Sequence, residues 1–176
     1  WLQSVDIDPW TTFTAIYQVY VPDVNFRVEL VSLGLGIVFD ANNDTPSTSV
    51  NTITQLVVNN KNISDLTGIS GFTALEVFDC RQNQLTTIDL SQNTLLTHLY
   101  VGVNQLTSLD LSNNPLLITL YCHINQLTSL DLSSNTGLKN LTCRNNLITS
   151  LDLSNNPNIL GVHCATNPIT SVDLTN

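Results

Sequence analysis

The chain has 176 residues and a net charge of −9, from 14 acidic and 5 basic residues. This balance argues against a nucleic-acid partner, which requires a basic face to meet the phosphates. Hydrophobic residues make up 42% of the chain, enough for a core, yet no run of about 18 apolar residues predicts a membrane span. The chain starts at Trp1 without a basic and then apolar leader, so we interpret it as a processed or trimmed piece of a longer protein.

The first 52 residues differ in pattern from the rest. Residues 1–20 predict an extended N-terminal segment, because their second half is rich in β-branched and aromatic residues. Residues 21–52 predict a cap made of a short helix, over about 24–33, and a polar loop. The helix signals are an N-cap, apolar side chains at helical spacing and a glycine stop: Asp23, Phe26, Leu30, Leu33, and Gly34 or Gly36. We expect this helix to cover the open apolar end of the repeats that follow.

Residues 53–176 are repeats. A unit of 21 residues starts at 75, 96, 117, 138 and 159, with Leu and Asn at fixed places. A fixed period of about 20–29 residues with this pattern indicates a leucine-rich repeat. The first coil, from Leu56 to Phe78, is one residue longer. The last coil stops at Asn176 without a distinct cap, which predicts either truncation of a longer array or end-to-end self-association through that coil.

The unit is itself doubled. Positions 1–10 read L-x-x-L-x-C-x-x-N-x and positions 11–21 read L-T-S-L-D-L-S-x-N-x-x. This nested pattern resembles the IRREKO-type bacterial leucine-rich repeats of secreted and surface proteins of Bacteroidetes, and VPDVNFRVEL and DLTGISGFT resemble the cap and first coil of those proteins. The run LTGISGF also resembles the 22-residue coils of internalin-like proteins. Over about residues 21–176, the resemblance implies a secreted or cell-surface binding or adhesion module, and it carries over no catalytic residue.

The predicted fold is therefore a leucine-rich-repeat solenoid, α+β but rich in β structure. It has a parallel β-sheet on the concave face, an extended non-helical convex face and a short N-terminal capping helix. Halves of ten or eleven residues leave little room for an α-helix on the convex side. Since successive strand residues point to opposite faces, positions 1, 4, 6, 11, 14 and 16 should form the core.

Three columns of the repeat should be structural. Asparagine amides can donate and accept at each bend, at position 9 (Asn83, Asn104, Asn125, Asn146, Asn167) and at position 19 (Asn93, Asn114, Asn135, Asn156). Position 6 holds Cys80, Val101, Cys122, Cys143 and Cys164. Because Val replaces Cys there, we predict buried free thiols rather than the disulfides that cysteines in an exported protein otherwise suggest.

The sequence stops repeating at the outward positions 3, 5, 7 and 8 of the first half. Tyr, His and Arg gather there, and Tyr and Arg in particular are common energetic anchors at interfaces. The alternative is that these positions are simply unconstrained surface. The predicted ligand-binding face consists of Asp79, Arg81, His98, Tyr100, Val103, Tyr121, His123, Ile124, Arg144 and His163.

The second half carries an aspartate at position 15 of every coil: Asp89, Asp110, Asp131, Asp152 and Asp173. In one interpretation each carboxylate accepts hydrogen bonds from neighbouring Ser and Thr groups. In the other, the column binds Ca²⁺, which prefers several oxygen ligands. The three histidines lie too far apart along and across the strands to share a zinc ion.

We therefore predict no enzyme, no cofactor and no bound metal. The preferred function is protein–protein interaction or adhesion, centred on Tyr100, Tyr121, His123 and Arg144. One alternative is polysaccharide binding, with Tyr100 and Tyr121 as a platform for sugar rings. Another is a structural spacer in a larger surface protein.

Overall fold

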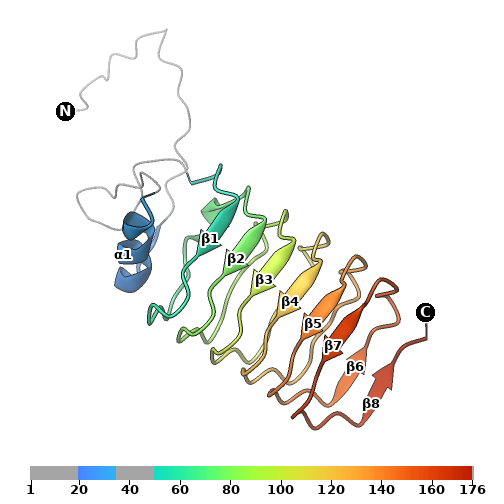
Figure 1. Ribbon diagram of the computed structural model, residues 1–176. Helices are drawn as coiled ribbons and strands as arrows, with labels where there is room; N and C mark the ends of the chain where they lie inside the picture. Colours follow the sequence, from blue (N-terminus) through green and yellow to red (C-terminus); the bar gives the residue numbers. More distant parts are fainter. Residues whose placement is uncertain (1–19, 35–49, 176) are drawn as a thin grey trace, which may run out of the picture.

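The computed structural model describes residues 20–34 and 50–175, and it shows a solenoid built from parallel strands (Figure 1). Six strands form one parallel sheet: β1 (Gln55–Val57), β2 (Val77–Asp79), β3 (His98–Tyr100), β4 (Thr119–Tyr121), β5 (Asn140–Thr142) and β7 (Gly161–His163). The predicted solenoid with a parallel sheet on one face is confirmed. Apart from Tyr20, the extended segment predicted over 1–20 lies outside the described residues, as does most of the polar loop predicted within 21–52.

The register of the sheet follows the sequence period. Val77 of β2 pairs with His98 of β3, 21 residues later, and this offset continues to β7. Gln55 of β1 pairs with Val77, which is 77 − 55 = 22 residues later, so the longer first coil is also confirmed. A slip of one residue would turn the core side chains outward, and the repeat prevents this slip.

The opposite side of the solenoid is extended. There β6 (Ser150–Asp152) pairs in parallel with β8 (Ser171–Asp173), again at an offset of 21 residues. Within residues 53–175, which the structure describes, the only helical turn is the 3-10 segment η1 (Ile69–Gly71). The prediction of a non-helical face opposite the sheet is therefore confirmed.

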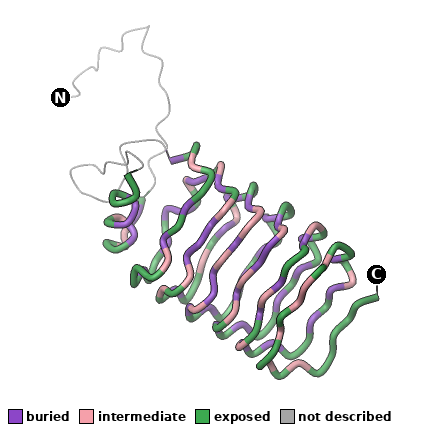
Figure 2. Tube along the Cα trace, viewed as in Figure 1, coloured by how far each residue is buried: buried purple, intermediate pink, exposed green. Residues whose placement is uncertain are grey.

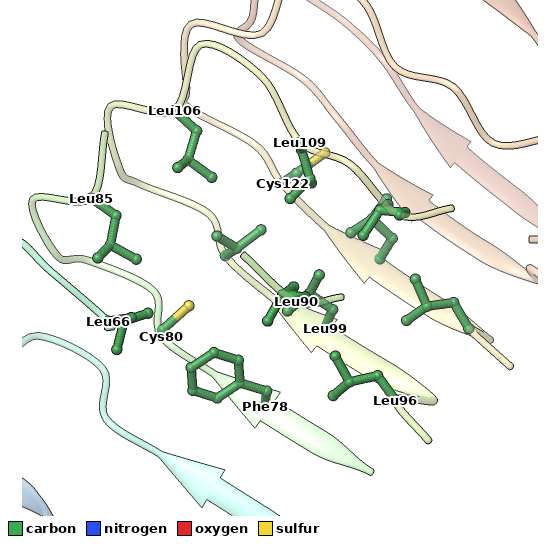
Figure 3. Packing of buried hydrophobic residues seen from close by; sticks show 14 of the residues in the cluster. Leu66, Phe78, Cys80, Leu85, Leu90, Leu96, Leu99, Leu106, Leu109 and Cys122 are labelled. Atoms are coloured by element: carbon green, nitrogen blue, oxygen red, sulfur yellow. The ribbon is translucent and has the colours of Figure 1, made fainter. Parts of the chain in front are cut away.

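Figure 3 shows the core, in which leucine, phenylalanine and cysteine side chains point inward between the two extended layers. The position-4 residues illustrate how complete the burial is, with exposures of 0–1% for Phe78, Leu99, Leu120 and Leu141. Burying one such side chain contributes about 1.5–3 kcal/mol. Because that gain requires a neighbouring coil on each side, the coils stabilise one another rather than themselves.

The two ends of this core differ, as the burial colours of Figure 2 show. At the amino end, the core is covered by α1 (Val24–Ser32), whose Phe26 and Leu30 are fully buried. At the other end, Val172 and Leu174 are 46% and 61% exposed. Self-association through this last coil stays a prediction.

Asp23 fixes the capping helix to the first coil. Its Oδ1 accepts hydrogen bonds from the backbone N–H groups of Asn25 and Phe26, which makes it the N-cap predicted from sequence. Its Oδ2 accepts from the backbone N–H of Ser64 and of Asp65. Partial burial alone would raise the pKa of Asp23, but these hydrogen bonds outweigh it and lower that pKa. An ion pair of 2.9 Å between Lys61 and Glu29 adds a second link.

The position-9 asparagines connect neighbouring coils. Asn125 Nδ2 donates to the carbonyls of Val101 and Cys122, at 3.1 Å each, and its Oδ1 accepts from the Leu106 N–H at 3.0 Å. Equivalent bonds occur at Asn83, Asn104, Asn146 and Asn167. The structural interpretation is confirmed, except that the second coil bonded is the preceding one and not the next.

The position-19 asparagines are more deeply buried, with 0% exposure, but less completely bonded. Asn114 Nδ2 donates to the carbonyls of Leu90 and Asn93, both in the preceding coil. Its Oδ1 has no hydrogen-bond partner among the described residues, and the same holds at Asn93, Asn135 and Asn156. This column therefore joins coils through its donors alone.

Replacing Asn125 with Ala should destabilise the protein by about 3 kcal/mol or more, because buried backbone groups would lose their partners at about 1–3 kcal/mol each. Denaturant unfolding measures this loss. The matched control is Asn113→Ala, since exposed Asn113 makes only one hydrogen bond of 3.3 Å, to Ser112. Equal stability of the two variants would contradict the structural role.

The cysteine column holds free thiols, as predicted. Cys80, Cys122 and Cys143 are buried, Cys164 is partly exposed, and Val101 occupies the same column with 0% exposure. Burial raises the pKa of the Cys80 and Cys122 thiols, and it raises the pKa of Cys143 to about 12. These thiols are therefore protonated near neutral pH and unreactive as nucleophiles.

A thiol reagent should accordingly label Cys164 first in the native protein. All four cysteines should react after denaturation, with or without prior reduction. Mass spectrometry of the labelled peptides identifies the sites, and fewer free thiols without reductant would reveal a disulfide.

Candidate ligand-binding face

The non-repeating side chains lie along the outer side of the six-stranded sheet. Positions 3 and 5 begin and end each strand, while positions 7 and 8 lie in the turn that follows it. Because the strands are parallel and in register, each position forms a column running across the coils. The columns at positions 5 and 7 bring the aromatic and basic residues together.

Asp79 and Arg81 form the most tightly bonded pair on this face. Arg81 Nε donates to Asp79 Oδ1 at 2.9 Å, and Nη2 donates to Oδ2 at 2.6 Å. Asn59 also donates to Oδ2, at 3.2 Å. Asp79 is only 6% exposed, so it differs from the exposed contact residue that the alternation predicts. Its role is to hold the Arg81 guanidinium in place.

These contacts decide the charge of the pair. Burial alone would raise the pKa of Asp79, but the hydrogen bonds from Arg81 and Asn59 outweigh that effect and lower it. The carboxylate therefore stays ionised near neutral pH and cancels the charge of Arg81. The pair therefore presents a fixed, planar guanidinium at the surface, and the net charge of the pair is low.

The tyrosines continue this arrangement across two coils. The Arg81 guanidinium carbon lies 5.2 Å from the centre of the Tyr100 ring, within cation–π range. Tyr100 and Tyr121 have ring centres 5.2 Å apart at an interplanar angle of 83°, an edge-to-face pair. The His98 ring lies 6.4 Å from Tyr100. Arg81, Tyr100 and Tyr121 thus form a connected row, which we call the aromatic row.

His123 leans from its own coil onto the preceding one. A Cβ at Gly102 would lie 2.5 Å from His123 Cε1, so the imidazole occupies the space that the missing side chain leaves. The Nδ1 atom is buried there without a hydrogen-bond partner among the described residues. Burial lowers the pKa of His123, and the charges of Arg144 and Arg81 lower it further. Gly102 is therefore a packing neighbour of this candidate site residue that the sequence analysis missed, although its signal was a glycine beside a histidine in one column.

The remaining predicted residues lie at the margins of the row. Arg144, His163 and Ile124 are exposed and Val103 is half-buried. The histidines do not converge, and among residues 20–34 and 50–175 no group of three His, Cys, Asp or Glu side chains could hold a metal ion. The same part of the chain has no helix long and apolar enough to cross a bilayer.

The aspartate column on the opposite side is bonded locally. Each Oδ1 accepts from the backbone N–H two residues later, at 2.9 Å in all five coils. These bonds lower the pKa of Asp89, Asp110 and Asp131. The pKa of Asp173 is lowered by hydrogen bonds from the hydroxyl and then the N–H of Thr175. The hydrogen-bonding interpretation is confirmed, and nothing in the described residues adds support for calcium.

The fold and its columns define a leucine-rich-repeat solenoid, and the comparisons with known proteins agree. No family model matches the chain. Internalin J of Listeria monocytogenes is 36% identical over 81 residues, which are 46% of this chain and 8% of that protein. The solved functional domain of InlJ, described as including a cysteine ladder, superposes with a TM-score of 0.79 at 37% identity, over 88% of this chain and 34% of that one.

The fold is shared more widely. Internalin C2 of the same species has a TM-score of 0.60 at 21% identity, over 90% of this chain and 82% of its own, which shows the fold alone. The relatives are thus bacterial leucine-rich-repeat proteins, and the chain spans only about a third of the InlJ structure. The narrower IRREKO assignment stays a prediction.

Replacing Gly102 with Ala should push the His123 ring outward, since the added Cβ and the ring claim the same space. The pKa of His123 should then rise towards its ordinary value of 6.5, because exposure removes the main cause of its lowering. An NMR titration of the imidazole protons measures the change. The matched control is Gly161→Ala, where the nearest atom lies 4.0 Å from the new Cβ, and an unchanged His123 titration in G102A would contradict the packing.

Proposed function

We propose that this chain is a protein-binding module whose ligand contacts the aromatic row and its margins, His123 and Arg144. The observation that carries the proposal is that different positions of each coil serve the fold and form the exposed surface. The repeating positions of the core and the bends are buried and fix the fold, whereas the positions that vary bring Tyr and Arg side chains together on one outer face.

The row is suited to binding because its side chains are already held. Asp79 fixes Arg81, Arg81 lies over Tyr100, and Tyr100 meets Tyr121. Binding a ligand therefore costs less side-chain entropy on this face than on free surface residues, where each immobilised long side chain costs about 0.5–1.5 kcal/mol. Tyr and Arg are also the residues that carry most binding energy at interfaces.

The relatives support the same class of function. Internalin J and the InlJ domain share more than a third of their matched residues with this chain, and non-catalytic binding is the function we infer from that similarity. We also propose that the chain is exported or displayed at a cell surface, as its resemblance to bacterial surface repeats implies.

The geometry favours a protein over a polysaccharide. Two tyrosines that form a flat platform for sugar rings need nearly parallel faces, and Tyr100 and Tyr121 meet at 83°. Only one of the two rings can lie flat under a given sugar. No observation on the sheet favours the spacer alternative, because a spacer gains nothing from a fixed aromatic row.

Replacing both Tyr100 and Tyr121 with Ala should weaken binding to a protein partner by about five- to thirtyfold per ring, since each truncated anchor costs about 1–2 kcal/mol. The probe is a panel of purified extracellular protein domains, screened by surface plasmon resonance against the wild-type chain. The control is Tyr20→Ala, because Tyr20 is 54% exposed and lies outside the sheet. Undiminished binding by a folded double variant would refute this face.

A further inference from the structure

One backbone feature recurs in every coil at position 8, directly after the strand. All six residues there have left-handed φ angles of 54–59°: Asn60, Gln82, Val103, Ile124, Asn145 and Thr166. Asparagine adopts this conformation readily, but β-branched side chains rarely do, because their Cβ substituents crowd the backbone. Val103, Ile124 and Thr166 are therefore strained, whereas Asn60 and Asn145 are not, and of the three only Val103 and Ile124 are aliphatic.

Hydrogen bonds between coils fix the left-handed backbone conformation of these residues. The N–H of Val103 donates to the carbonyl of His123 at 2.8 Å, and the N–H of Ile124 donates to the carbonyl of Arg144 at 3.0 Å. The same bond, from position 8 to position 7 of the next coil, occurs at Asn60, Gln82 and Asn145. Because this ladder fixes the turn, a β-branched residue remains left-handed and its strain is not released.

Burial in the fold does not offset this strain. Ile124 is 41% exposed, Val103 is only half-buried, and neither belongs to the hydrophobic core cluster. An asparagine would suit both positions, as the same turn shows at Asn60 and Asn145. The chain thus places two aliphatic side chains where folding alone favours a polar residue.

Their location links the strain to the aromatic row. Val103 lies in the coil of Tyr100, and Ile124 lies in the coil of Tyr121 and His123. In the coil before and the coil after, position 8 is Gln82 and Asn145, which are polar. The aliphatic residues therefore coincide with the two coils that carry the tyrosines.

The charge beside them is positive although the whole chain is acidic. Arg81 is neutralised by Asp79, but among the described residues Arg144 is exposed and takes part in no ion pair. Arg144 is close enough to lower the pKa of His123, and its carbonyl accepts the N–H of Ile124. Arg144, a cation without an ion-pair partner among the described residues, is thus hydrogen-bonded through its backbone to the residue that carries the exposed aliphatic side chain.

We propose that Val103 and Ile124 are the apolar anchors of the binding face, retained there at a cost in stability. The occupant is a polypeptide segment that is both acidic and aliphatic. Its aliphatic side chains pack on Val103 and Ile124, and a carboxylate pairs with Arg144. This inference rests on the proposed protein-binding function and specifies the chemistry of the partner.

The test is the double variant Val103→Asn with Ile124→Asn. Relief of two strained residues should raise its melting temperature by about 4 °C or more. The probe for binding is an array of short synthetic peptides in which Asp and Glu alternate with Leu, Ile and Val. The wild-type chain should capture these peptides, and the variant should capture them at least about tenfold more weakly, a loss of about 1.4 kcal/mol.

The chain offers matched controls in the same column. Gln82→Asn and Thr166→Asn keep the turn but lie outside the two coils, so they should leave capture unchanged, and Thr166→Asn should also raise the melting temperature. Asn145→Val introduces the strain into the next coil and should lower the melting temperature. Arg144→Gln should weaken capture of acidic peptides without changing capture of versions with Ser in place of the acids.

The outcomes separate this inference from the proposed function. If V103N/I124N keeps full capture while Y100A/Y121A loses it, the face stands and the anchors are wrong. If both variants keep full capture, the face is wrong as well. A melting temperature that does not rise in V103N/I124N overturns the strain argument. Preference for Lys-substituted peptides, for glycans or for no peptide at all overturns the acidic, aliphatic partner.

Discussion

Each position-9 asparagine holds two coils at once. Asn125 bonds its own coil through the Cys122 carbonyl and the preceding coil through the Val101 carbonyl and the Leu106 N–H. No single coil could satisfy these groups by itself, since the bend leaves them facing the core, where an unpaired polar group is costly. The bend of one coil is therefore stable only when the next coil is in place, and this dependence makes the solenoid cooperative along its length.

That constraint also explains why the residues of the proposed binding face collect on one side of the solenoid. The core and the bends fix positions 1, 4, 6, 9, 11, 14, 16 and 19, because each is buried against its equivalents in adjacent coils. The outward strand positions are not constrained by packing in this way, and parallel pairing in register aligns them into columns. A change of one residue there alters the surface without altering the backbone. Tyr100 and Tyr121 can therefore contact each other across two coils, and neither side chain disturbs the backbone of the solenoid.

The period of the sequence predicts what depends on spacing. It predicts the register, the inward leucines, the asparagine bends and the buried thiols, because each follows from alternation or from the chemistry of one residue type. The capping role of Asp23 follows from a local helix signal outside the repeats. It does not predict what depends on side-chain rotation. Asp79 is buried because Asn59 and Arg81 close over it, and His123 leans over Gly102 because of a space in another coil. Both involve a pair of residues about twenty positions apart, Asn59 with Asp79 and Gly102 with His123, in which neither residue repeats.

The left-handed turn at position 8 joins these two levels. Its backbone is imposed by the inter-coil hydrogen bonds that also define the solenoid, so the fold fixes φ and the residue only determines how well that φ is tolerated. Where the residue is Asn, as at Asn60 and Asn145, the demands of fold and residue agree. Where the residue is Val103 or Ile124, the φ that the fold requires conflicts with the φ that the side chain prefers. Such local conflict in an otherwise consistent sequence is expected at functional sites. These inter-coil hydrogen bonds keep the backbone at position 8 from relaxing. Replacing Asn by a β-branched residue there should therefore have a measurable effect on stability. Stability and binding should therefore change in opposite directions at these two positions, whereas at the core positions a destabilising change would lower both together.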